Sequence, residues 1–138
     1  MILNKKYTIF VLSSLFALFI TYKFTNNNQL SDSLLSKEVI EEANKNLPMK
    51  VSENLRYDLL FRENKILHYK YTFTNYTAQT IEINTMIQTF EDKTKQSICI
   101  NPQTKVLLKN LITLEYDFYD KNNFFVNKIK IEPSYCNY

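Results

Sequence analysis

The sequence predicts an α+β protein. An N-terminal transmembrane helix comes first, followed by the order α-β-β-α-α-β-β, with a four-stranded antiparallel sheet covered by helices on one face. Three observations predict this. A long apolar run opens the chain, alternating apolar and polar residues mark two pairs of strands, and apolar residues at helical spacing precede and separate those pairs. With 138 residues, 45% of them hydrophobic, the chain has room for one domain with a modest core.

The apolar run near the start predicts a retained signal-anchor rather than a cleaved signal peptide. It carries no charge from Tyr7 until Lys23, and no small-residue cleavage site follows it. Tyrosines at both ends suit the two membrane interfaces. The expected anchor residues are Tyr7, Ile9, Phe10, Val11, Leu12, Leu15, Phe16, Leu18, Phe19, Ile20 and Tyr22.

Two lysines, Lys5 and Lys6, precede the run and predict its orientation, because positive residues tend to stay in the cytoplasm. We therefore expect a single-pass inner-membrane protein whose C-terminal domain lies in the periplasm. Secretion after cleavage of a signal peptide is the alternative. The expected organisation is an anchor at 1–24, a polar tether at 25–30 and an extracytoplasmic α+β domain at 31–138.

The first half of that domain shows one helix and two strands. Apolar spacing predicts a helix at 32–46, ended by Pro48. Strict alternation predicts a strand at 51–61 with its odd positions buried, Leu59 and Phe61 included. A second strand follows at 67–74 after a hairpin turn at 62–65.

The second half also shows helices followed by two strands. Apolar residues predict a helix at about 80–97, and Asn101 can cap a short helix whose first residue is Pro102. Alternation predicts a strand at 112–119. A turn then leads to a last strand at 124–131.

The only two cysteines, Cys99 and Cys136, are predicted to form a disulfide. An outward-facing domain lies where disulfides persist, and no C-x-x-C motif indicates a redox site. A catalytic or redox thiol is the alternative. The bond would tie the end of the last strand to the helical layer.

Catalytic motifs are missing from the sequence. It has no glycine, which removes the Walker A loop, the dinucleotide fingerprint and the nucleophile elbow. His68 is the only histidine and is expected to be a solvated residue in the middle of a strand. We therefore expect no catalytic residues, no cofactor and no metal. Carboxylates from distant strands could still form a glycosidase-type pair.

Other polar and aromatic patterns are expected to be structural. The neighbours Glu41 and Glu42, like Glu91 and Asp92, point in different directions on a helix and suit solvated faces. The aromatic stripes are expected to pack in the core. Three lysines of the 17 basic residues flank the apolar run, which leaves 14 basic residues against all 14 acidic ones. A neutral domain of this kind disfavours nucleic-acid binding.

The chain resembles a group of small bacterial envelope proteins of unassigned activity that have an N-terminal membrane anchor and a two-cysteine α+β domain. The shared pattern is Leu47, Pro48, Tyr69, Tyr71, Cys99, Pro102, Leu107, Leu108, Thr113, Leu114, Tyr116, Tyr119, Asp120 and Cys136. Where such proteins usually carry Gly, this chain has Asn110 or Leu111, and Asn123. The resemblance supports the fold and the cysteine pair and implies no catalytic residues.

These observations predict a non-enzymatic envelope protein. It would be anchored in the membrane and would act by contact with another protein, as a secretion or conjugation accessory or as a toxin-neutralising protein. One alternative is an envelope hydrolase or carbohydrate-binding domain that uses separated carboxylates and tyrosines. Another is a sensor of small apolar ligands. The sequence does not identify the partner or the oligomeric state.

Overall fold

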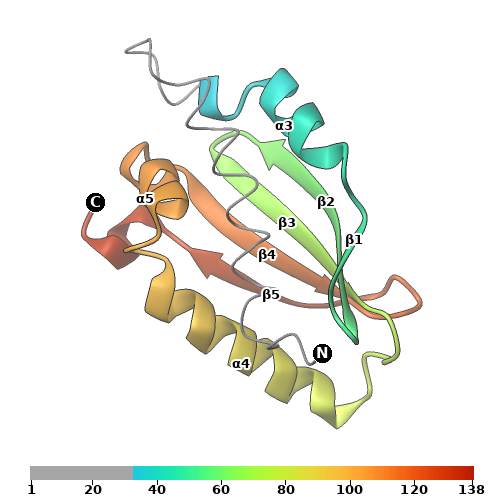
Figure 1. The fold of residues 1–138 in the computed structure, drawn as a ribbon. Helices are drawn as coiled ribbons and strands as arrows, with labels where there is room; N and C mark the ends of the chain where they lie inside the picture. Colours follow the sequence, from blue (N-terminus) through green and yellow to red (C-terminus); the bar gives the residue numbers. More distant parts are fainter. Residues whose placement is uncertain (1–32) are drawn as a thin grey trace, which may run out of the picture.

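The computed structural model describes residues 33–138, and Figure 1 shows their arrangement. In chain order the elements are α3 Lys37–Asn44, β1 Met49–Ser52, β2 Leu55–Glu63, β3 Ile66–Phe73, α4 Ile81–Ser97, α5 Pro102–Lys109, β4 Thr113–Tyr119, β5 Phe125–Ile131 and the 3₁₀ helix η1 Pro133–Cys136. No helix in this part of the chain is long and apolar enough to cross a membrane. The predicted anchor, its two lysines and the tether lie outside the described residues.

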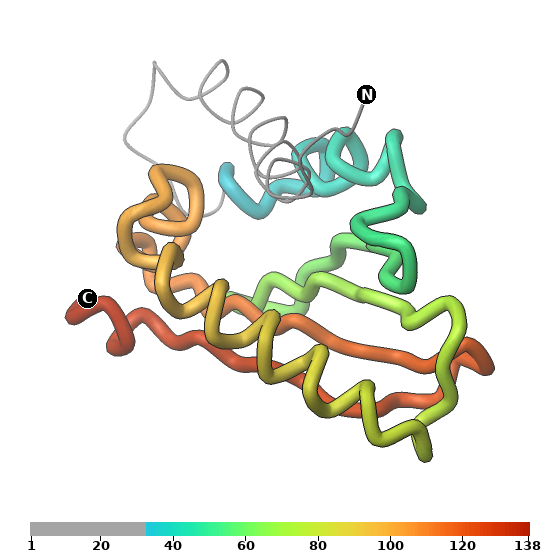
Figure 2. Tube along the Cα trace, turned by 60° about the horizontal axis from the view of Figure 1, so that its bottom comes forward, coloured from blue at the N-terminus to red at the C-terminus, as the bar shows by residue number. Residues whose placement is uncertain are grey.

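The sheet has five strands in the order β1-β2-β3-β4-β5, so the predicted four-stranded antiparallel sheet is wrong. The central strands β3 and β4 run parallel, whereas the other neighbouring pairs are antiparallel. The connection explains the difference. The helices between β3 and β4 carry the chain back along the sheet, so β4 runs in the same direction as β3. Figure 2 shows α4 lying along one face of the sheet.

The predicted first strand, 51–61, is in fact two strands joined by a tight turn. Ser52 pairs with Leu55, so the chain reverses at Glu53 and Asn54. Two-residue hairpin turns usually contain Gly, and this one does not. The apolar alternation of 51–61 continues across this turn by coincidence. The sequence pattern therefore gives no sign of the turn.

A β-bulge in β2 then moves the alternation by one residue. The register against β3 changes between Tyr57 and Leu59, with Asp58 as the extra residue. Leu60 therefore joins the core, where it is 1% exposed. Leu59 and Phe61, which were predicted to be buried, are instead 41% and 36% exposed on the opposite face.

Helix α3 begins later than the predicted 32–46 and protects an edge of the sheet. Its N-cap is Ser36, whose hydroxyl accepts a hydrogen bond from the Val39 amide. At the other end, the Asn44 side-chain amide donates to the Leu60 carbonyl at 2.7 Å and accepts from the Leu60 amide at 2.8 Å. Leu60 lies beyond the residues of β2 that pair with β1, so Asn44 satisfies backbone groups there that β1 does not reach.

The crossover helices begin as predicted. Helix α4 matches the expected 80–97 to within one residue at its start. The Asn101 side chain accepts a hydrogen bond from the Gln103 amide at 3.0 Å, and Pro102 is the first residue of α5. The cap, the proline and the apolar spacing are local signals, so they could be read from the sequence.

Helix α5 ends in a Schellman motif that lacks the usual glycine. The Ile112 amide donates to the Leu107 carbonyl at 3.1 Å, and the Leu111 amide donates to the Leu108 carbonyl at 3.0 Å. Leu111 occupies the left-handed position, with φ of 61°. A branched side chain is costly in that conformation.

The core lies between the sheet and the two crossover helices and is rich in aromatic rings. Ring centroids lie 5.7 Å apart between Tyr71 and Phe118, and 5.2 Å apart between Phe118 and Phe90 of α4. Tyr69 stacks on Tyr116 at 4.9 Å. The predicted aromatic stripes are therefore part of the core. Its fully buried members include Leu67, Phe73, Ile83, Leu107, Leu108, Ile112 and Leu114.

The predicted disulfide joins Cys99, which follows α4, to Cys136 in η1. Their Cα atoms lie 5.5 Å apart, and 37 positions separate them in the sequence. The bond ties the segment after β5 to the helical layer, as expected from the sequence.

Candidate functional site

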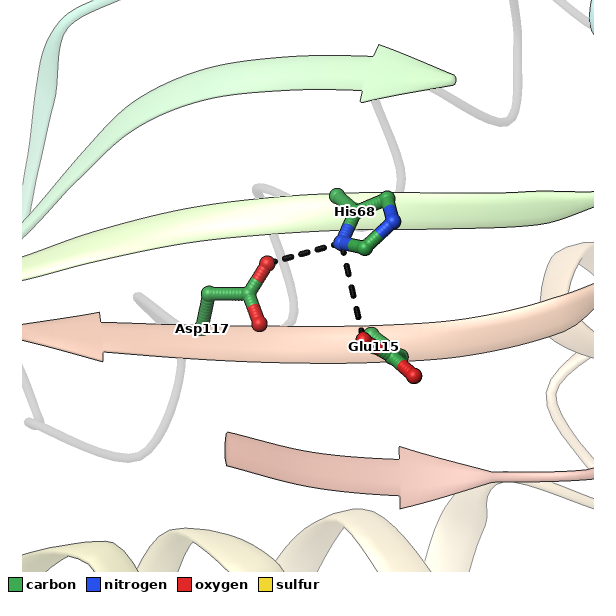
Figure 3. A group of neighbouring side chains, drawn as sticks. All are labelled: His68, Glu115 and Asp117. Carbon is green, nitrogen blue, oxygen red and sulfur yellow. Dashed lines mark hydrogen bonds and ion pairs between the residues drawn. The ribbon is translucent and has the colours of Figure 1, made fainter. Parts of the chain in front are cut away.

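A buried polar cluster lies on the face of the sheet opposite α4 and α5. It consists of His68 from β3 and of Glu115 and Asp117 from β4 (Figure 3). His68 is the register partner of Glu115, and Asp117 lies two residues further along on the same face. All three residues are at least 90% buried, with exposed fractions of 7%, 4% and 7%.

The histidine ring is the centre of the cluster. Its Nδ1 atom lies 2.8 Å from Asp117 Oδ2, a hydrogen-bond distance, and 3.7 Å from Glu115 Oε2. One ligand atom from each of the three residues can be chosen so that all lie within 4.8 Å of one another. Two carboxylates and one imidazole therefore converge on a single small volume.

The surroundings hold the ring in place. Phe61, the register partner of His68 on β2, stacks on the imidazole with centroids 4.5 Å apart and planes 4° apart. The bulge in β2 is what brings Phe61 to this face. On the other side of the ring, Nε2 is buried and lacks a hydrogen-bond partner among the described residues. The Glu63 carboxylate lies 3.6 Å from it.

Negative charge exceeds positive charge around His68. Lys128 of β5 donates to Glu115 at 3.1 Å. Lys130, the register partner of Glu115, also interacts with it electrostatically, although its ion pair is with Glu132. Lys70 Nζ bonds the Asn123 side chain at 2.9 Å. Among the described residues, Lys128 is thus the one lysine in an ion pair with the carboxylates of Glu63, Glu115 and Asp117, and a buried carboxylate is costly unless it is compensated.

The expectation that His68 is solvated is wrong. His68 does lie on the polar face of β3, but it is buried there because Phe61 covers it and β4 places two carboxylates beside it. Those carboxylates lie about fifty residues further along the chain, beyond any local pattern. One signal was available: Glu115 and Asp117 stand inside an alternating strand, where acidic residues are uncommon.

A hydrolase or carbohydrate-binding site would need carboxylates and tyrosines to converge, but the core tyrosines do not converge with the carboxylates of this cluster. Tyr116 lies between Glu115 and Asp117 in the sequence and points to the other face of the sheet, into the core. Two surface depressions do not include the three residues of the cluster, although Phe61, which stacks on His68, lines one of them. One is lined by Lys130, Glu132, Ser134 and Tyr135, and the other by Leu35, Lys37, Ile40, Glu41, Phe61 and Arg62.

The acidic neighbours on the helices have the structural roles expected of them. Glu41 pairs with Lys37 at 3.5 Å on an exposed face of α3, and Glu91 pairs with Lys95 on α4. Both are pairs four residues apart on a helix, which support the helix only weakly because solvent screens them. They do not lie in the polar cluster.

Two solved structures share the fold. One is a Pseudomonas aeruginosa protein thought to be secreted, with a TM-score of 0.62, 17% identity, and coverage of 94% of this chain and 96% of that chain. The other is the pilotin EpsS of the Vibrio vulnificus type 2 secretion system, with a TM-score of 0.58, 11% identity, and coverage of 81% of this chain and 99% of that chain.

Comparison with curated protein sequences gives no match. A family model does match residues 29–127, which include all of α3, the first four strands and both crossover helices. The chain belongs to the family described as Domain of unknown function (DUF8479).

Proposed function

We propose that this chain is a non-enzymatic accessory of bacterial secretion that acts by contact with another protein outside the cytoplasm. The observation that carries the proposal is the likeness to the Vibrio vulnificus pilotin, which extends over 99% of that protein. A pilotin is a component of a secretion system. The same fold is thus used within a secretion system, where a chain can act without catalysis.

Two further observations support a location outside the cytoplasm. The Cys99–Cys136 disulfide suits an oxidising compartment. The Pseudomonas aeruginosa protein of the same fold is thought to be secreted. We place the N-terminal apolar run in the inner membrane as a retained anchor, with Lys5 and Lys6 on the cytoplasmic side.

The disulfide end of the domain offers a contact surface. Ile100 and Tyr135 flank the two cysteines in the sequence, and they are 76% and 48% exposed. Large apolar side chains gathered on a surface often mark a protein interface. The disulfide links the two segments, so Ile100 and Tyr135 are held at the same end of the domain without help from a partner.

Site-specific photo-cross-linking in the native host tests the proposal. A photoreactive residue at Ile100 or at Tyr135 should yield a cross-linked product that contains a component of a secretion assembly, identified by mass spectrometry. The matched control is Glu82, an exposed residue on α4. Absence of products at both test positions in folded protein, or the same products from Glu82, would contradict the proposed contact surface.

A further inference from the structure

We propose that His68, Glu115 and Asp117 form a binding site for a first-row divalent transition metal ion of the Zn²⁺ type. The donor set is one imidazole nitrogen and two carboxylate oxygens, all at least 90% buried. Imidazole together with carboxylate suits zinc and its neighbours, whereas Ca²⁺ and Mg²⁺ prefer oxygen ligands alone. This inference does not depend on the secretion role.

The distances fit a metal centre after small side-chain movements. Ligand bonds of about 2.1 Å at tetrahedral angles place neighbouring ligand atoms about 3.4 Å apart. The two contacts of His68 Nδ1 lie on either side of that value, at 2.8 Å to Asp117 Oδ2 and 3.7 Å to Glu115 Oε2. Three protein ligands leave at least one position for water or for a group from a partner.

The far side of the imidazole, at Nε2, has the arrangement expected of the groups that surround the ligands of a metal site. A metal on Nδ1 leaves the single proton of the neutral ring on Nε2. That nitrogen is buried without a hydrogen-bond partner among the described residues, and the Glu63 carboxylate lies 3.6 Å from it. A metal-bound histidine commonly directs its other N–H at a carboxylate in this way. The Phe61 ring, stacked on the imidazole, fixes the plane of the ligand.

The charge balance also favours a cation. Three carboxylates surround His68, and within residues 33–138 Lys128 supplies the one lysine ion pair to them, while Lys130 interacts with Glu115 from the neighbouring strand. Lys128 and Glu63 have side chains that are 51% and 70% exposed, so the buried ligands lie directly beneath solvent-accessible groups. An ion can therefore reach the site without opening the core.

The competing explanation is that the charge of a protonated His68 alone balances the carboxylates. The two explanations differ in where the protons of the ring lie. A protonated ring carries a proton on each nitrogen, whereas a metal-bound ring carries one proton, on Nε2. Because His68 is the only histidine in the chain, its ring nitrogens can be observed without ambiguity.

The test is a Zn²⁺ titration of the full-length chain, prepared in detergent without a histidine tag and followed by imidazole ¹⁵N NMR and calorimetry. We expect saturation at one Zn²⁺ per chain, loss of the Nδ1 proton and retention of the Nε2 proton. Both cysteines are in the disulfide, so they do not compete for the metal. An imidazole spectrum unchanged at excess Zn²⁺, or metal bound at Nε2, would overturn the proposal.

Matched variants locate the metal. Asp117→Asn and Glu115→Gln should each weaken Zn²⁺ binding at least about tenfold, and Glu63→Gln should weaken it by about 10- to 100-fold through the outer shell. Asp58→Asn removes a carboxylate that bonds Thr72 and Arg56 on the same face, outside the cluster, and should leave binding unchanged. Equal weakening by Asp58→Asn would contradict the assignment.

The metal site can still be tested if Asp117→Asn or Glu115→Gln, which alter buried residues, fails to fold. The Glu63 side chain is largely exposed, so Glu63→Gln should preserve the fold and can carry the comparison with Asp58→Asn alone. Wild-type affinity in Glu63→Gln would rule out the proposed outer-shell hydrogen bond. The imidazole spectrum of this folded variant reads metal binding at Nδ1 directly, and a spectrum unchanged at excess Zn²⁺ would overturn the proposal.

Discussion

The two faces of the central strands β3 and β4 are built from alternate residues of the same short segments, yet their chemistry is opposite. The helix-covered face carries Tyr71, Tyr116 and Phe118, whose rings pack against one another and against α4. The opposite face carries His68 and the acidic residues beside it. One face therefore provides most of the stability of the domain, while the other holds charged groups whose neutralisation by the described residues is incomplete.

The largest expected effect comes from removing a ring on the helix-covered face. Phe118 is 0% exposed and contacts aromatic residues of both β3 and α4. Phe118→Ala should lower the free energy of unfolding by about 3–5 kcal/mol, measured by urea denaturation. The matched change Phe125→Ala, at a residue that is 54% exposed, should cost less than about 1 kcal/mol. Similar losses in both variants would contradict the contrast between buried and exposed rings.

The disulfide should have the next largest effect. Replacing both cysteines by serine opens a loop of 37 positions and should lower the free energy of unfolding by up to about 4 kcal/mol. Because the bond lies at one end of the domain, the double variant should keep the sheet, as judged by far-UV circular dichroism. A double variant with unchanged thermal stability would show that the bond contributes nothing.

Alkaline pH should act on the tyrosines of the helix-covered face. Burial raises the pKa of Tyr57, Tyr69, Tyr71 and Tyr116, and neighbouring tyrosines raise it further in the first three. Above about pH 10 the unfolded chain releases these protons while the folded chain retains them, so stability falls. Each such tyrosine should contribute a loss of about 1.4 kcal/mol per pH unit.

Tyr116→Phe sharpens this pH prediction, because it removes one of those protons and should make stability fall less steeply between pH 10 and 11. Urea denaturation at several pH values measures the slope, and ultraviolet absorbance counts the tyrosines that ionise. Ionisation of all the tyrosines at their ordinary pKa in a domain that remains folded would contradict the burial of this face.

The smallest expected effect lies outside both faces, at the end of α5. Leu111 occupies a left-handed position with φ of 61° and is 57% exposed, so its side chain contributes little to the core. Leu111→Gly should raise the free energy of unfolding by up to about 1 kcal/mol, because relief of the backbone strain exceeds the added entropy of the unfolded chain. A destabilised variant in thermal denaturation would assign a packing role to the leucine.

Elements with local signals could be predicted from the sequence. The alternation of β3 and β4, the apolar spacing of α4 and the cap at Asn101 all depend on residues close together in the chain. The chain reversal at Glu53 and Asn54 lacks a glycine, and the bulge at Asp58 leaves no clear mark on the pattern. The parallel pairing of β3 with β4 depends on where the crossover helices pack.

The polar cluster could not be predicted from the sequence either, because it depends on the parallel pairing of β3 with β4. His68 and Asp117 are 49 positions apart, and only the parallel register brings them together. Each residue alone suits a solvated strand position. The disulfide, by contrast, could be predicted, because two cysteines allow one intramolecular pairing and the expected outward-facing location favours its oxidation.

The proposed function requires this domain to work outside the cytoplasm. Mass spectrometry of the protein isolated from its host under non-reducing, alkylating conditions tests this location, because it counts the free thiols of Cys99 and Cys136 and reports the N-terminus in the same spectrum. We predict no free thiol and an intact Met1, as expected for an oxidised domain held by its anchor. Two free thiols would place the domain in a reducing compartment and would contradict the proposed role in secretion.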